Sequence, residues 1–228
     1  MFSASTATEI RQVARELKIE PATLLAVAEI ESGGKAFASV DGRREPVIRF
    51  EGHYFDRRLS PDNRSRARLA KLASPLAGRV RNPALQVDRW AMLERAAAID
   101  RKAAYESVSW GLGQVMGAHW AWLGYASVDA LANEARSGVA GQVRLMARYI
   151  EKAGLAPALR ARDWKAFALG YNGPGFAKNR YDERMAEAYH RYDTIATEPE
   201  PEPAPEPQSV LGIRIIPAWL GALKLRRR

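Results

Sequence analysis

Cysteine is absent from this 228-residue sequence, and long apolar runs and recognisable metal-binding patterns are missing as well. Without cysteine there is no disulfide framework, no thiolate zinc or iron–sulfur site and no cysteine nucleophile. No stretch approaches about 18 uninterrupted apolar residues, which argues against a helix that spans a membrane. The three histidines are scattered, and no His-Glu-x-x-His, phosphate-binding loop or nucleophile elbow occurs. We therefore expect no metal and no cofactor.

Positive charge is in excess. Lys and Arg number 35 against 26 Asp and Glu, which gives a net charge of +9 and favours an anionic partner: nucleic acid, anionic lipid or the bacterial cell wall. The Arg-rich stretch at residues 57–68 lacks interleaved aromatic side chains, so it predicts a solvated basic face and no specific nucleic-acid site. The first residues lack a basic start followed by an apolar run, so no secretory signal is visible.

The composition changes abruptly at Glu198. Residues 198–207 alternate Glu or Ala with Pro, which predicts an extended polyproline-II linker. Residues 208–228 then hold five basic residues and no acidic one among apolar residues such as Trp219, which is typical of a tail that lies on a membrane interface. A frayed terminus is the alternative. Residues 1–197 form the body of the protein. Hydrophobic residues make up 47% of the whole chain, so a body of this length can bury a core.

The body is expected to be mainly α with a small β element. A capping-box pattern at Thr6 predicts a helix to about Leu17, and Pro21 begins a second helix that runs through Ile30 and is stopped by a Gly-Gly pair. An Asp-Gly turn at residues 41–42 predicts a short hairpin within residues 37–50. Further helices are expected over residues 84–106, 127–152, 163–171 and 177–195.

Glu31 is the first candidate catalytic residue. It ends an apolar helix where the Gly-Gly turn opens the backbone to a cleft. A carboxyl group beside packed apolar groups keeps its proton near neutral pH and can donate it to a leaving oxygen. Glu29 lies about 200° around the same helix, so only one of the two can face the cleft. Taken alone, this fragment also fits a solvated charge at a helix end.

Glu51 is the second candidate, about twenty residues further along. Hydrolysis of a glycosidic bond usually needs a second carboxylate, which activates water or stabilises an oxocarbenium ion, and a hairpin folded over the helix end could supply it. Glu51 could instead pair with Arg49, Arg57 or Arg58.

Two further segments have the composition of a sugar-binding cleft. Residues 109–116 place Trp110, as a flat apolar face for a sugar ring, and Gln114, as a source of amide donors and acceptors, among glycines that allow close approach. Tyr171 and Asn172 stand before Gly-Pro-Gly at the end of a predicted helix. The second segment could also be a simple helix stop with a capping Asn.

Three segments, in order along the chain, resemble the three signatures of the lysozyme-like superfamily: residues 28–34 (Ala-Glu-Ile-Glu-Ser-Gly-Gly), 109–114 (Ser-Trp-Gly-Leu-Gly-Gln) and 170–175 (Gly-Tyr-Asn-Gly-Pro-Gly). This superfamily includes goose-type lysozymes and soluble lytic transglycosylases. The sequence is most similar to the N-acetylmuramidase family of modular phage endolysins, also at residues 47–53, 93–100 and 161–164. The resemblance covers about residues 8–193.

The resemblance implies an α+β lysozyme-like fold, with a hairpin lining the cleft, and cleavage of the β-1,4 bond between N-acetylmuramic acid and N-acetylglucosamine in peptidoglycan. Glu31 then matches the catalytic acid, Glu51 lies in the hairpin segment, and Gln114, Tyr171 and Asn172 match cleft positions that hold substrate. It also implies synthesis in the host cytoplasm, action on the periplasmic wall and a monomer. Many members carry a separate peptidoglycan-binding module, which we do not find in this sequence, so wall affinity is expected from the basic body or the tail.

Two alternatives keep the same fold. A lytic transglycosylase would let the muramyl 6-hydroxyl attack in place of water and would leave 1,6-anhydro ends. A non-catalytic wall-binding module would use only the shape and the charge.

Overall fold

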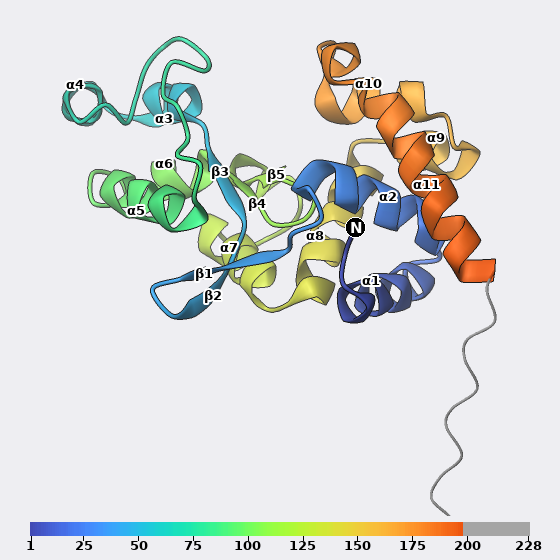
Figure 1. The fold of residues 1–228 in the computed structure, drawn as a ribbon. Coiled ribbons are helices and arrows are strands. Elements are labelled where there is room, and N and C mark those ends of the chain that lie inside the picture. The colour runs from blue at the N-terminus through green and yellow to red at the C-terminus, as the bar shows by residue number, and fades with distance from the viewer. Residues whose placement is uncertain (198–228) are drawn as a thin grey trace, which may run out of the picture. The chain divides into compact units, whose positions relative to one another are not determined.

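The computed structural model describes residues 1–197 of the chain, and the predicted linker and tail lie outside the described residues. Figure 1 shows helices packed around a few short strands. The helices are α1 (Ala4–Glu16), α2 (Pro21–Ser32), α3 (Gly52–Arg58), α4 (Pro61–Leu69), α5 (Gln86–Ala97), α6 (Arg101–Glu106), α7 (Val128–Arg136), α8 (Val139–Lys152), α9 (Ala156–Ala161), α10 (Trp164–Asn172) and α11 (Tyr181–Thr197), with 3₁₀ turns η1 (Gly117–His119) and η2 (Phe176–Asn179). The mainly α prediction is confirmed.

The strands form two small antiparallel sheets. β1 (Phe37–Val40) and β2 (Arg43–Pro46) make the predicted hairpin, with Val40 opposite Arg43. Its turn residues, Asp41 and Gly42, have φ of 48° and 76°, the two positive values that a tight hairpin turn requires. β3 (Ile48–Phe50), β4 (Val108–Trp110) and β5 (Val115–Met116) form the second sheet in that order.

Two amide side chains complete the outer edge of β3. Asn82 exchanges hydrogen bonds of 2.8 and 2.7 Å with the backbone of Phe50, and Gln86 accepts at 2.9 Å from the backbone N–H of Ile48. These bonds satisfy backbone groups that no neighbouring strand reaches. The strand that leads to Glu51 is therefore fixed on both sides.

The buried side chains form two cores. One surrounds the second sheet and includes Phe50, Phe55, Trp90 and Trp110. The other lies among α1, α2, α10 and α11 and includes Leu24, Leu25, Phe167 and Tyr192. α8 contributes Leu145 to the first and Met146 to the second, so it joins them. α2 is buried from Ala22 to Glu29 because α1 and α11 both pack against it.

Several predicted boundaries were wrong because capping groups interrupt the helical pattern. The side chain of Ser3, not Thr6, accepts from the first turn of α1, so that helix begins earlier. The expected helix over residues 84–106 is divided where the Asp100 side chain caps α6, and the one over 127–152 is divided at Gly138, whose φ is 149°. The short helices α3, α4 and α9 were not predicted.

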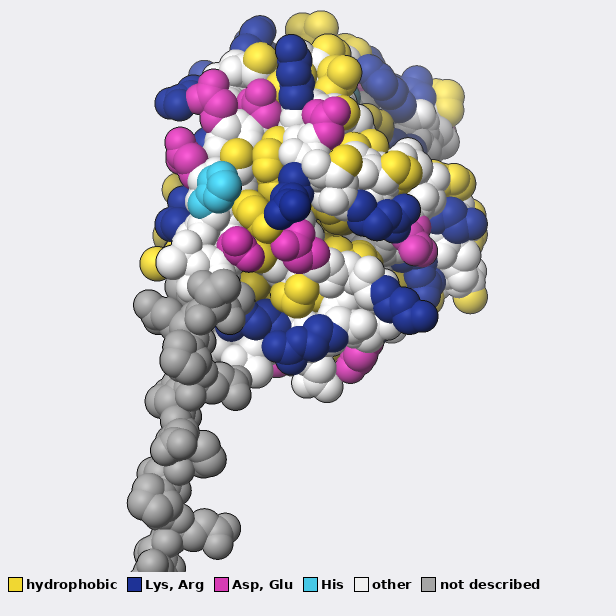
Figure 2. Space-filling model, turned by 90° about the vertical axis from the view of Figure 1, so that its right-hand side faces the viewer, with side chains coloured by type: hydrophobic (Ala, Val, Ile, Leu, Met, Phe, Trp, Pro, Cys, Tyr) yellow, Lys and Arg dark blue, Asp and Glu magenta, His cyan; other side chains and the backbone are white. Residues whose placement is uncertain are grey.

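The face that carries α9–α11 and α1 mixes its charges. Figure 2 shows this face, on which Lys and Arg lie among acidic and apolar side chains and do not gather into one patch. Within residues 1–197 no helix is both long and apolar enough to cross a bilayer.

Candidate active site

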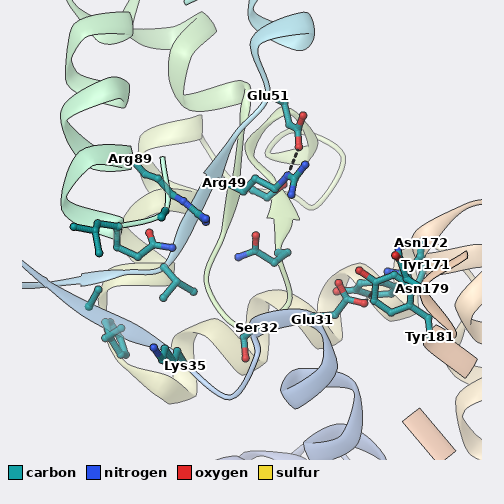
Figure 3. A pocket seen from close by; sticks show the side chains of 18 of the residues that line it. Glu31, Ser32, Lys35, Arg49, Glu51, Arg89, Tyr171, Asn172, Asn179 and Tyr181 are labelled. Carbon is teal, nitrogen blue, oxygen red and sulfur yellow. Dashed lines mark hydrogen bonds and ion pairs between the residues drawn. The ribbon is translucent and has the colours of Figure 1, made fainter. Parts of the chain in front are cut away.

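A cleft of about 1250 Å³ opens where α2 ends. Its walls come from both cores: the end of α2, the hairpin, β3, the beginning of α5, β4 and the turn after α10. The charged and polar side chains along it include Glu31, Ser32, Lys35, Ser39, Arg49, Glu51, Gln86, Arg89, Ser109, Gln114, Tyr171, Asn172, Asn179 and Tyr181. Figure 3 shows Glu31 beside Tyr171 and Asn172 at one end, with Arg89 and Lys35 toward the other.

Glu31 stands in the last turn of α2 and points into this cleft. Gly33 ends the helix in the left-handed region at φ 64°, which only glycine adopts readily. Burial raises the pKa of Glu31 to about 7, against the opposing effects of a hydrogen bond from Asn172 and the charge of Arg184. About half of the Glu31 carboxyl groups therefore keep their proton at neutral pH, and this residue can act as an acid.

Glu29, on the opposite side of α2, faces away from the cleft. Its carboxylate accepts from the side chains of Arg191, at 2.6 Å, and Tyr192, both on α11. Only one of the two helix carboxylates reaches the cleft, as the helical geometry predicts.

The end of α10 supplies the groups nearest to Glu31. Asn172 Nδ2 donates to Glu31 Oε1 at 2.7 Å, and the buried Oδ1 of Asn172 has no partner among the described residues. Tyr171 donates its hydroxyl to Gly113 O at 2.6 Å, and its ring stacks on Phe167. Burial raises the pKa of Tyr171 well above its usual range, so the phenol stays neutral.

The turn at residues 111–114 forms the next part of the wall. Gly111 and Gln114 have positive φ of 63° and 46°, and Gln114 Nε2 donates to Gly111 O at 2.8 Å. The buried Gln142 accepts from Leu112 N at 2.9 Å and donates to the carbonyl oxygens of Ala36 and Ala135. Gln142 thus fixes the turn to the segment that follows α2.

Glu51 lies across the cleft from Glu31 (Figure 3). It precedes α3, and its backbone N–H donates to Ser107 O at 2.8 Å. Its carboxylate accepts from Arg49 Nε at 2.7 Å and lies 3.6 Å from His53 Nδ1. The ion pair with Arg49 that the sequence allowed is present, and the carboxylate still lines the cleft.

The chain combines a mainly helical domain, a hairpin beside a cleft and a carboxyl group with a raised pKa at a helix end. Residues 20–193 match the muramidase family, described as N-acetylmuramidase. The chain belongs to this N-acetylmuramidase family. The crystal structure of the endolysin of Burkholderia phage AP3 is similar at 33% identity and a TM-score of 0.70, over 82% of this chain and 71% of that one. No curated protein matches the chain.

Membership makes the protein a glycoside hydrolase of the lysozyme type that acts on peptidoglycan. Five of the six site residues expected in this muramidase line the cleft: Glu31, Glu51, Gln114, Tyr171 and Asn172.

The prediction for Trp110 is wrong. Its side chain is fully buried among Trp90 and Tyr105, and its Nε1–H donates to Tyr105 O at 3.3 Å, so it cannot stack on a sugar. Alternate residues of a strand face opposite sides, and it is Ser109 that turns toward the cleft of the muramidase.

Sequence reasoning missed Lys35, Arg89 and Gln142. Lys35 follows the Gly-Gly turn, so its closeness to Glu31 was a usable signal. Arg89 and Gln142 lie far away in the chain and had no local signal. Among the described residues no group of three or more His, Asp or Glu side chains could hold a metal ion.

Proposed function

We propose that the protein is an endolysin that hydrolyses the β-1,4 bond between N-acetylmuramic acid and N-acetylglucosamine, with Glu31 as the general acid. The observation that carries this assignment is a carboxyl group with its pKa raised to about 7 by burial at the edge of a long polar cleft. Such a group gives its proton to the glycosidic oxygen as the bond to the leaving sugar lengthens.

Asn172 positions this acid. Its 2.7 Å hydrogen bond holds the Glu31 carboxyl at the end of α10 and becomes stronger when the proton has left and the carboxylate is charged. Tyr171 anchors the same helix end to the turn at residues 111–114 through its bond to Gly113 O. Gln114 then presents its side-chain oxygen to the glycan, since its Nε2 is already bonded to Gly111 O.

Glu51 is the second carboxylate of the proposal. Its place across the cleft suits activation of water or stabilisation of the positive charge that develops on the sugar ring. The 2.7 Å ion pair with Arg49 holds the carboxylate in position.

Mass spectrometry of the soluble products from purified Gram-negative peptidoglycan tests this function. Hydrolysis leaves reducing muramic acid ends, whereas attack by the muramyl 6-hydroxyl would leave anhydro ends that are lighter by one water. Anhydro ends would replace the hydrolytic mechanism with transglycosylation. Binding to walls without soluble products would instead show a non-catalytic wall-binding module.

We expect activity to fall above pH 7. The acid works only while Glu31 is protonated, so kcat/KM should decrease about tenfold per pH unit above its pKa of about 7. The bond from Asn172 lowers that pKa, so Asn172→Ala should raise it. The variant should have a lower rate, and the alkaline limb of its profile of kcat/KM against pH should move to higher pH.

Asn179→Ala is the matched control, because Asn179 lines the same cleft and has no hydrogen bond to Glu31. The alkaline limb of the Asn179→Ala profile should stay where it is in the wild type. A limb that is unmoved, or moved to lower pH, in Asn172→Ala would contradict the assignment of Glu31.

The tail at residues 208–228 is proposed to bind anionic lipid, either the inner membrane or lipopolysaccharide. Its basic residues suit phosphate groups, and Trp219 and its leucines suit acyl chains. A variant truncated after Pro207 should digest purified peptidoglycan at the full rate but lose binding to anionic phospholipid vesicles in a flotation assay. Equal vesicle binding by both forms would rule this role out. Vesicles of zwitterionic lipid are the control.

A further inference from the structure

The end of the cleft away from Asn172 carries cations that have no acidic partner. Lys35 is exposed in the loop after α2, and Arg89 is half-buried one turn into α5; both line the cleft (Figure 3). Among the described residues neither one forms an ion pair. Two uncompensated cations in one cleft lower the free energy of any anion that enters it.

Arg89 is held in a fixed orientation. Its Nε donates to Pro83 O at 2.8 Å and its Nη1 to Ile48 O at 3.0 Å. These bonds use Nε and Nη1 and leave Nη2 without a partner among the described residues. Burial, and then the nearby charge of Arg49, lower the pKa of Arg89, so the charged guanidinium is less stable here than in water.

Arg49 attracts an incoming anion less strongly than Lys35 and Arg89 do, because Glu51 already pairs with it at 2.7 Å. The acidic residues that line the cleft are Glu31 and Glu51. Glu31 is half-protonated near neutral pH, and Glu51 is neutralised by Arg49. The end of the cleft at Lys35 and Arg89 therefore keeps a net positive charge.

We propose that Lys35 and Arg89 bind a carboxylate of the peptide stem of peptidoglycan, so that the enzyme selects glycan whose muramic acid carries an acidic stem. This inference rests on the proposed function. The stem is attached to the lactyl group of the muramic acid at the scissile bond, and it carries free carboxylates. The sugar rings and their acetamido groups are neutral, so the stem is the part of this substrate that a cationic site recognises.

Two soluble glycan oligomers with the same stem peptides, one with free carboxylates and one with primary carboxamides, test this selection. The wild type should cleave the carboxylate form with about tenfold higher kcat/KM, mainly through a lower KM, as expected for charge-assisted hydrogen bonds that form in the bound state. The ratio should shrink as salt is added, because ions screen the exposed Lys35.

Lys35→Gln and Arg89→Gln should each remove most of that preference while the carboxamide form is cleaved at nearly the wild-type rate. Lys165→Gln is the control for Lys35, since it is an exposed lysine on α10 outside the cleft. Arg95→Gln is the control for Arg89: it lies on the same helix, donates to Ala70 O at 3.0 Å and does not line the cleft. Both controls should keep the preference.

Arg89→Gln also loses two bonds to backbone carbonyls, so its thermal unfolding is measured alongside; Lys35→Gln has no such partner and carries the test if Arg89→Gln is unstable. Equal cleavage of both oligomers by the wild type, or an unchanged preference in Lys35→Gln, would overturn the inference. If the wild type cleaves neither oligomer, the proposed function fails, and calorimetric binding of the two oligomers to Glu31→Gln still decides whether the stem carboxylate is recognised.

Discussion

Glu31→Gln should lower the rate of peptidoglycan cleavage by about 10²–10⁴-fold and leave the protein folded. The amide has nearly the same shape as the carboxyl group, and its oxygen still accepts the 2.7 Å bond from Asn172 Nδ2. It has no proton to transfer to the leaving oxygen. The measurement is the release of reducing ends from purified walls, together with thermal unfolding of both proteins.

Glu29→Gln is the matched control, two residues earlier on the same helix. Glu29 pairs with Arg191 and Tyr192 on α11 and does not line the cleft. Its loss should lower the unfolding temperature, because the buried Glu29 carboxylate loses its ion pair with the exposed Arg191, but leave the rate below that temperature close to the wild type. A nearly full rate in Glu31→Gln, or an equal loss of rate in both variants, would refute the role of Glu31 as the acid.

The catalytic end of α2 could be predicted from sequence because its information is local. The apolar run from Ala22, the helix stop at Gly33 and the 200° separation of Glu29 and Glu31 all lie within one short segment. The hairpin followed in the same way from an Asp-Gly pair between short strands. These features depend on backbone preferences of neighbouring residues, which the sequence displays directly.

Trp110 shows where composition misleads. An aromatic residue just before two glycines suggested a sugar platform, but the residue belongs to a three-residue strand with Ser109 at its centre. The side chains of a strand alternate, so the polar Ser109 faces the cleft and the apolar Val108 and Trp110 enter the core. A strand of three residues is too short for its alternation of apolar and polar residues to be recognised in the sequence.

Arg89 and Gln142 show what a local pattern cannot supply. Arg89 reaches the cleft because α5 packs beside β3, and its orientation depends on the carbonyl of Ile48, 41 residues earlier. Gln142 acts through Leu112, Ala36 and Ala135, which lie in three separate segments of the chain: two connecting loops and α7. Such contacts are set by tertiary packing and leave no trace in neighbouring residues.

Gln142→Leu should give the largest loss of stability of the substitutions considered. The change leaves the N–H of Leu112 and the carbonyl of Ala135 buried without their present partner, while the carbonyl of Ala36 keeps its 3.1 Å bond from Val47 N. Each unsatisfied group costs about 1–3 kcal/mol, so the free energy of unfolding should fall by about 3–5 kcal/mol and the unfolding temperature by about 10 °C. Denaturant and thermal unfolding measure both.

The same substitution should also reduce activity at temperatures where the variant is folded. Leu112 N is the point at which Gln142 holds the turn that carries Gln114 and receives the hydroxyl of Tyr171, so a loosened turn misplaces the wall of the cleft next to Glu31. Gln12→Leu is the control: Gln12 is exposed on α1, and within residues 1–197 its side chain bonds only to Glu16, at 3.2 Å. It should change stability by less than about 0.5 kcal/mol. If Gln142→Leu has the same free energy of unfolding as Gln12→Leu and keeps its full rate, the turn is held by its own backbone geometry, and the hydrogen bonds of the Gln142 side chain are not needed.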